Sequence, residues 1–137
     1  MAWKQRLQTL ILVVIDAFLD VRIKKTQYLV FDTGGTNVKY ALMDNEGQLL
    51  EKGKRPSADN LDDFVAALYE IGDQYKGKFT GIAVYAPGKI DTEKMIIHYG
   101  GALTFLDGLN LEETLGFRYG VAVSAEDDAK GQPGAGQ

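Results

Sequence analysis

The alternation of hydrophobic and polar residues over positions 28–54 predicts three consecutive strands. The first ends at Asp32, and the pattern resumes over residues 38–43 after the tight turn at Gly34 and Gly35. A second turn signal at residues 45–47 precedes a third strand expected over residues 49–54. Short turns between neighbouring strands favour antiparallel pairing. We therefore expect three antiparallel strands at the start of the domain.

Helical spacing replaces this alternation after Asn60. A helix is predicted from Asn60 to the basic last turn and glycine cap at Lys76 and Gly77. Its acidic first turn suits the helix dipole. The residues expected on its buried face are Leu61, Phe64, Leu68 and Ile71, with Val65 and Tyr75 on its flanks.

The rest of the chain predicts an open α/β sheet. Residues 79–86 form a near-continuous apolar run, typical of a central strand covered on both faces. A short strand over 95–99 follows. A helix from Asn110, with Glu113 completing a capping box, is expected to reach about residue 115, and a last strand covers 121–124. The fold class is α/β, with a mixed sheet whose strand ends gather Asp32, Pro87-Gly88 and Asp127-Asp128, where ligands bind in such sheets.

Composition narrows the functional classes. The 137 residues fit one ordinary domain, and the net charge of −4 argues against a nucleic-acid-binding surface. The chain has no cysteine, which excludes thiolate metal sites and fits a reducing cytosol. Residues 1–26 differ from the rest: their apolar run is too short to span a membrane, and Trp3, Leu7, Leu10, Val14, Phe18 and Val21 recur at helical spacing. We expect an amphipathic extension there and assign it no function.

The turn after Asp32 carries candidate chemistry. Gly34 and Gly35 can leave backbone amides exposed, and such a loop can bind phosphate. The Asp32 carboxylate could hold an accompanying Mg²⁺, directly or through water. A plain hairpin with a Gly-Gly turn explains the same residues. The glycine motif alone leaves both interpretations open.

Four motifs, in order, resemble those of the ROK family of sugar kinases. They are Asp32-Thr-Gly-Gly-Thr-Asn-Val-Lys39, Gly81-Ile-Ala-Val-Tyr-Ala-Pro-Gly88, the Gly-Gly-Ala at 100–102 with Asn110-Leu-Glu-Glu113, and Val123-Ser-Ala-Glu-Asp-Asp-Ala-Lys130. Residues 27–130 are similar to the N-terminal domain of bacterial glucokinases and β-glucoside kinases. The resemblance implies a ribonuclease-H-like (actin-like ATPase) domain and ATP-dependent phosphorylation of a hexose or related sugar, in the cytoplasm and without a zinc site in this chain.

The resemblance also implies roles for individual residues. Asp128 would accept the proton of a sugar hydroxyl, and Asp32 would orient hydrated Mg²⁺. The residues expected to hold ATP are Asp32, Gly34, Gly35, Thr36 and Asn37, and those expected to bind the sugar are Gly88, Lys89, Asp127 and Asp128. Alternative interpretations are a helix N-cap for Asp127 and Asp128, a solvent-facing lysine at Lys39 and a structural role for the lone His98.

Two departures from the family pattern matter. Asp127 stands where the family usually has Asn. A carboxylate only accepts hydrogen bonds, whereas an amide both donates and accepts them, so one contact to a sugar hydroxyl would have to reverse. After Lys130 the chain reads Gly-Gln-Pro-Gly-Ala-Gly-Gln, residues 131–137, where the family continues into a helix and a second domain.

We therefore expect little or no kinase activity from this chain alone, and association of chains through the exposed domain-docking face. A non-catalytic sugar- or partner-binding remnant is the alternative. A sugar-responsive repressor would need a DNA-binding module that 25 preceding residues are too few to form.

Overall fold

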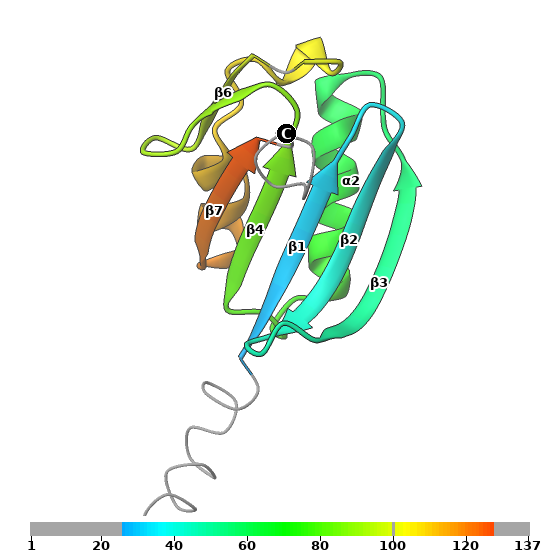
Figure 1. The fold of residues 1–137 in the computed structure, drawn as a ribbon, viewed down its shortest axis with the longest axis vertical. Helices are drawn as coiled ribbons and strands as arrows, with labels where there is room; N and C mark the ends of the chain where they lie inside the picture. Colours follow the sequence, from blue (N-terminus) through cyan, green and yellow to red (C-terminus); the bar gives the residue numbers. More distant parts are fainter. Residues whose placement is uncertain (1–25, 100, 128–137) are drawn as a thin grey trace, which may run out of the picture.

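A mixed five-stranded sheet forms the centre of the molecule (Figure 1). The computed structural model describes residues 26–99 and 101–127. The strand order is β3-β2-β1-β4-β7. The strands are β1 (Gln27–Thr33), β2 (Asn37–Asp44), β3 (Leu49–Pro56), β4 (Gly81–Ala86) and β7 (Ala122–Asp127). Because β1, β2 and β3 pair antiparallel while β4 and β7 run parallel to β1, the predicted mixed sheet is confirmed.

Helices lie on one face of this sheet. Figure 1 shows α2 (Leu61–Gln74) behind β1 and β2, and the turns η2 (Glu112–Gly116) and α3 (Phe117–Tyr119) behind β7. A hairpin of β5 (Lys89–Asp91) and β6 (Ile96–Tyr99) and the turn η1 (Thr104–Leu106) follow β4. The chain reaches β4 from β3 through α2, and β7 from β4 through α3. Two crossovers of the same hand place their helices on the same face.

The helix α2 forms where the spacing of apolar residues predicted it. Asn60 is its N-cap, and its Oδ1 accepts the Asp63 amide at 2.8 Å. The predicted end was wrong. The helix stops at Gln74 with Tyr75 as C-cap and no basic residue in its last turn. Tyr75 is 3% exposed and donates its hydroxyl to Glu51 of β3, so packing of this ring on the sheet ends the helix early.

Three predicted boundaries in the second half also need correction. The central strand begins at Gly81 rather than at residue 79, although Phe79 is buried. The helix capped by Asn110, whose Oδ1 accepts the Glu113 amide at 3.0 Å, continues past residue 115 to Tyr119. The last strand extends to Asp127 because it pairs with β4 over its whole length. The short strand predicted over 95–99 is confirmed as β6, whereas its partner strand β5 and the turn η1 were not expected from the sequence.

The hydrophobic core lies between α2 and the sheet. Leu29 and Phe31 of β1 are fully buried, and Leu68 and Ile71 of α2 are at most 1% exposed. Thr33 is also buried and donates its hydroxyl to the Tyr85 carbonyl at 2.9 Å. Alternate residues of each strand point to this side, since side chains alternate across a strand.

The opposite side of the sheet, here called the open face, is covered by no helix of residues 26–99 and 101–127. Strand alternation and register place these residues on it: Tyr28, Val30 and Asp32 of β1; Lys39, Ala41 and Met43 of β2; Lys52 and Lys54 of β3; Ala83 and Tyr85 of β4; Ser124 and Glu126 of β7. Within the described part, the expectation that the central strand is covered on both faces was wrong: Ile82 and Val84 are buried, whereas Ala83 and Tyr85 are only half-buried.

Candidate functional site

The carboxyl ends of three parallel strands meet at one edge of the sheet (Figure 1). Asp32 of β1 lies beside Tyr85 of β4, and Ala86 of β4 lies beside Asp127 of β7. The sequence motifs after these strands are therefore neighbours in space although they are far apart in the chain. Ligands of open α/β sheets bind at this kind of edge.

The loop after β1 is held through its carbonyl groups. Ser57 donates its hydroxyl to the Gly34 carbonyl at 2.6 Å and its amide to the Thr36 carbonyl at 2.9 Å. The Gly34 amide donates to the Asn37 carbonyl. Gly35 and Thr36 are exposed, and their amides donate to no acceptor within the described residues. Two free amides in a fixed loop suit an anion such as phosphate.

Two glycines allow this loop to approach the neighbouring loops. A Cβ on Gly35 would lie 3.2 Å from the Cβ of Ala102. Gly101 has φ +57°, and a Cβ there would lie 3.1 Å from the Cβ of Pro87 and 3.3 Å from the Gly88 amide nitrogen. The glycine turn after β1, the Pro87-Gly88 turn after β4 and the 101–102 segment therefore pack against one another.

Asp32 lies at the end of β1 on the open face. It is half-buried, and its carboxylate has no hydrogen bond or ion pair within the described residues. Lys39 is its cross-strand partner, and Lys54 is in turn opposite Lys39. In the described part no group of three or more His, Asp or Glu could hold a metal. One carboxylate still fits Mg²⁺ bound through water, because this ion keeps several waters and takes its other ligands from phosphate.

A cleft of about 360 Å³ lies between the ends of β4 and β7 and the β5–β6 hairpin. Asp127, half-buried at the end of β7, lines it together with Tyr85, Glu126 and Met95. Met95 has φ 57°, a left-handed conformation that few non-glycine residues adopt. The end of β7 therefore places Asp127 at the cleft, while the helix N-cap alternative depends on residues outside the described part.

The remaining predicted site residues are placed less centrally. Gly88 has φ +91° and begins the hairpin, and Lys89 follows it as an exposed residue of β5. Asp128 lies outside the described residues. Lys39 is exposed on the open face. His98 has a side chain 58% exposed, and its Nε2 lies 3.8 Å from Asp91 Oδ2 across the hairpin.

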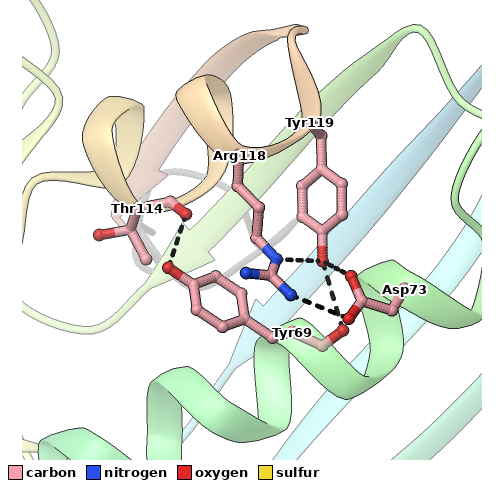
Figure 2. A network of polar contacts seen from close by, with 5 residues as sticks. All are labelled: Tyr69, Asp73, Thr114, Arg118 and Tyr119. Atoms are coloured by element: carbon pink, nitrogen blue, oxygen red, sulfur yellow. Dashed lines mark hydrogen bonds and ion pairs between the residues drawn. The ribbon is translucent and has the colours of Figure 1, made fainter.

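A polar network between α2 and α3 was missed by sequence reasoning (Figure 2). Arg118 donates to Asp73 Oδ2 at 2.9 Å, and Tyr119 donates its hydroxyl to Asp73 Oδ1 at 2.7 Å. The Arg118 guanidinium stacks 3.9 Å above the Tyr69 ring, whose hydroxyl donates to the Thr114 carbonyl. These contacts fix α3 on α2, and α3 leads directly into β7 and Asp127.

The network also shifts the pKa values of its members. The hydrogen bond from Arg118, followed by that from Tyr119, lowers the pKa of Asp73. Burial, followed by the hydrogen bond to Asp73, raises the pKa of Tyr119 to about 12. Both shifts favour the charged carboxylate and the neutral phenol that the geometry requires. Because the network lies on the helix side of the sheet, away from the strand ends, we interpret these pKa shifts as a consequence of packing and not as a sign of catalysis.

Residues 28–135 match the model of the ROK family. The chain belongs to the ROK family. It is 34% identical over 99 residues to a beta-glucoside kinase of Klebsiella pneumoniae, covering 72% of this chain and 33% of that protein. A beta-glucoside kinase of Listeria monocytogenes is also 34% identical, over 100 residues that cover 72% of this chain and 34% of that protein. This ROK chain therefore spans about one third of the length of the curated relatives it matches.

Solved ROK structures share the fold. A ROK family protein from Streptococcus pneumoniae, crystallised with sucrose, superposes with a TM-score of 0.69 at 29% identity, covering 76% of this chain and 35% of that one. A ROK family glucokinase from Streptomyces griseus, in complex with glucose and AMPPNP, gives a TM-score of 0.66 at 21% identity over 75% of this chain and 33% of that one, which supports the fold alone. The fold is that of the actin-like ATPases, as the sequence predicted. No helix among the described residues is long and apolar enough to cross a membrane.

Proposed function

We propose that this chain supplies the N-terminal lobe of an ATP-dependent sugar kinase acting on a hexose or a β-glucoside. The observation that carries the proposal is the convergence of the Gly35–Thr36 amides, Asp32 and Asp127 at one edge of the sheet. The kinship with beta-glucoside kinases supports the substrate class. We place the activity in the cytoplasm, where ATP is available.

The residues of this edge would divide the work of phosphoryl transfer. Such a reaction needs fixed phosphates, a positioned hydroxyl and a base that accepts its proton. The amides of Gly35 and Thr36, with the Gly34 and Asn37 turn around them, would bind ATP phosphates, and Asp32 would hold Mg²⁺ through water. When bound, this ion would neutralise phosphate charge.

The acceptor sugar would lie in the cleft beside Asp127. As a carboxylate, Asp127 would accept a hydrogen bond from one sugar hydroxyl, and Asp128, the next residue, would accept the proton of the hydroxyl that attacks. Gly88 and Lys89 would line the entrance, since β5 begins beside the ends of β4 and β7.

We expect this chain to bind its ligands without catalysing phosphoryl transfer at an appreciable rate. Because it spans one third of the length of the kinases, we expect the 137 residues to bind ATP and sugar weakly and to release little or no ADP. Substantial sugar-dependent ADP release by the pure protein would contradict this expectation. Sugar binding without any ATP binding would favour the alternative of a non-catalytic sugar-binding protein.

The test is a titration of ¹⁵N-labelled protein with Mg-ATP and, separately, with glucose and cellobiose. We expect ATP to shift the amide signals of residues 34–37, and sugar to shift those around Gly88 and Asp127. Asp32→Asn should abolish the magnesium dependence of the ATP shifts. Asp62→Asn, an exposed residue at the start of α2, should leave it unchanged. Absence of shifts at residues 34–37 at millimolar Mg-ATP would refute the assignment of the nucleotide site.

A further inference from the structure

Ser57 fixes two peptide groups of the loop that follows β1. It lies half-buried directly after β3, and its hydroxyl donates to the Gly34 carbonyl at 2.6 Å. Its backbone amide donates to the Thr36 carbonyl at 2.9 Å. A single residue from another part of the chain thus holds the two carbonyl groups on either side of Gly35.

The direction of the Gly35 amide follows from the first of these bonds. The Gly34 carbonyl and the Gly35 N–H belong to the same peptide group, and in a planar trans peptide these two bonds point in opposite directions. No peptide bond of the described part is cis. Because the carbonyl points toward Ser57, the N–H points away from it, on the side where Gly35 is exposed.

The remaining bonds of the loop keep its carbonyl groups occupied. The Thr36 carbonyl accepts the Ser57 amide, and the Asn37 carbonyl accepts the Gly34 amide at 2.9 Å. A carbonyl oxygen carries partial negative charge, so a free one beside a phosphate would repel it. With these carbonyls engaged, the loop offers an anion the amides of Gly35 and Thr36, which have no acceptor within the described residues.

We propose that Ser57 is a positioning residue for phosphate binding. By holding the Gly34 and Thr36 carbonyls, it keeps the Gly35 amide directed at the phosphates of the nucleotide, and it acts through the loop rather than by touching the ligand. This inference rests on the proposed function, because it takes the loop after β1 as the nucleotide site. Without the hydroxyl, the peptide group between Gly34 and Gly35 can rotate, and binding must first order it at a cost in affinity.

The test compares variants of the ¹⁵N-labelled chain in titrations with Mg-ATP. Ser57→Ala removes the hydroxyl and should raise the Kd about five- to ten-fold, the range expected for the loss of one well-made hydrogen bond. Ser57→Thr keeps a hydroxyl at the same position, and its Kd should stay within about two-fold of that of the starting protein.

The chain offers a matched control at the opposite end of β1. There Thr80 donates its hydroxyl at 3.4 Å and its amide at 2.8 Å to the carbonyl of Gln27, the first residue of the strand. Thr80→Ala therefore removes the same kind of contact far from the loop and should leave the Kd for Mg-ATP unchanged.

A measurement without ligand separates positioning from a general loss of stability. In ¹⁵N relaxation, the amides of Gly35 and Thr36 should show order parameters of about 0.85 in the starting protein and in Ser57→Thr, and of about 0.6 in Ser57→Ala. The order parameters of the α2 amides, and the shifts that sugar causes at Gly88 and Asp127, should be the same in all variants.

Failure of this inference can be told apart from failure of the proposed function. If Mg-ATP shifts no amide of residues 34–37 in the starting protein, the nucleotide site is refuted and the role of Ser57 with it. If the starting protein binds Mg-ATP and Ser57→Ala binds it equally well, only the role of Ser57 is overturned. Unchanged order parameters at Gly35 in Ser57→Ala would likewise overturn that role.

Discussion

The two faces of the sheet differ in how deeply their side chains are buried, although the same strands form both. On the α2 side, Leu29, Phe31 and Val38 are at most 1% exposed, and a polar network fixes the helices that cover them. On the open face, Val30 and Ala41 are only half-buried, and lysines of β2 and β3 lie along a groove on the same face. The covered face carries the stability of the domain, whereas the open face and the adjoining strand ends carry the residues that we propose to bind ligands. Strand alternation thus separates the buried side chains from the proposed binding residues.

The largest expected effect is a difference in the free energy of unfolding between leucine-to-alanine substitutions on the two sides of the sheet. Leu68→Ala removes a fully buried side chain from α2 and should lower the free energy of unfolding by about 2–5 kcal/mol. Leu49 is 56% exposed beside the open face, so Leu49→Ala should cost under about 1 kcal/mol. Urea unfolding of both variants measures the difference. Similar losses would mean that the open face is packed as tightly as the core.

Much of this contrast was accessible from the sequence, for local reasons. The helical spacing of Phe64, Leu68 and Ile71 predicted the buried face of α2, because periodicity is a property of neighbouring residues. The turn at Gly34 and Gly35 was predicted in the same way. Alternation over 28–32 and 38–43 predicted the first two strands, and their register follows from the short turn between them.

The sequence could not predict features that depend on distant contacts. Asp73 and Arg118 are 45 residues apart, and nothing in either neighbourhood marks the other as a partner. Glu126 and Asp127 are polar and gave no strand signal, yet pairing with Tyr85 and Ala86 continues β7 through them. In the turn between β5 and β6, the Asp91 carboxylate accepts hydrogen bonds from the amides of Glu93 and Lys94. This stretch is too short and too polar to show periodicity in the sequence.

An intermediate effect is expected from the network on the covered face. Tyr119→Phe removes the hydroxyl that donates to Asp73 Oδ1 and should lower the free energy of unfolding by about 1 kcal/mol. Tyr28→Phe is the matched change on the open face, where the side chain is 39% exposed, and should leave stability within about 0.5 kcal/mol of the starting protein. Equal effects of the two substitutions in urea unfolding would show that the network does not secure α3.

The smallest expected effect is a pH dependence of the free energy of unfolding, caused by Tyr119 on the covered face. The pKa of Tyr119 is about 12 in the folded protein, above the ordinary value of 10.0, so the folded state holds this proton more tightly than the unfolded state. The stabilisation is complete below pH 10 and is lost as the pH rises through the folded pKa, because the unfolded state ionises first.

Urea midpoints measured between pH 9 and 11.5 would reveal this loss. Tyr119→Phe should reduce the decline, since a phenylalanine cannot ionise, whereas Tyr28→Phe should keep it. Lysine titration contributes equally to all three proteins and cancels in the comparison. If Tyr119→Phe declined as steeply as the starting protein, the phenol would not be held neutral by burial and Asp73, and the covered face would not owe its rigidity to this contact.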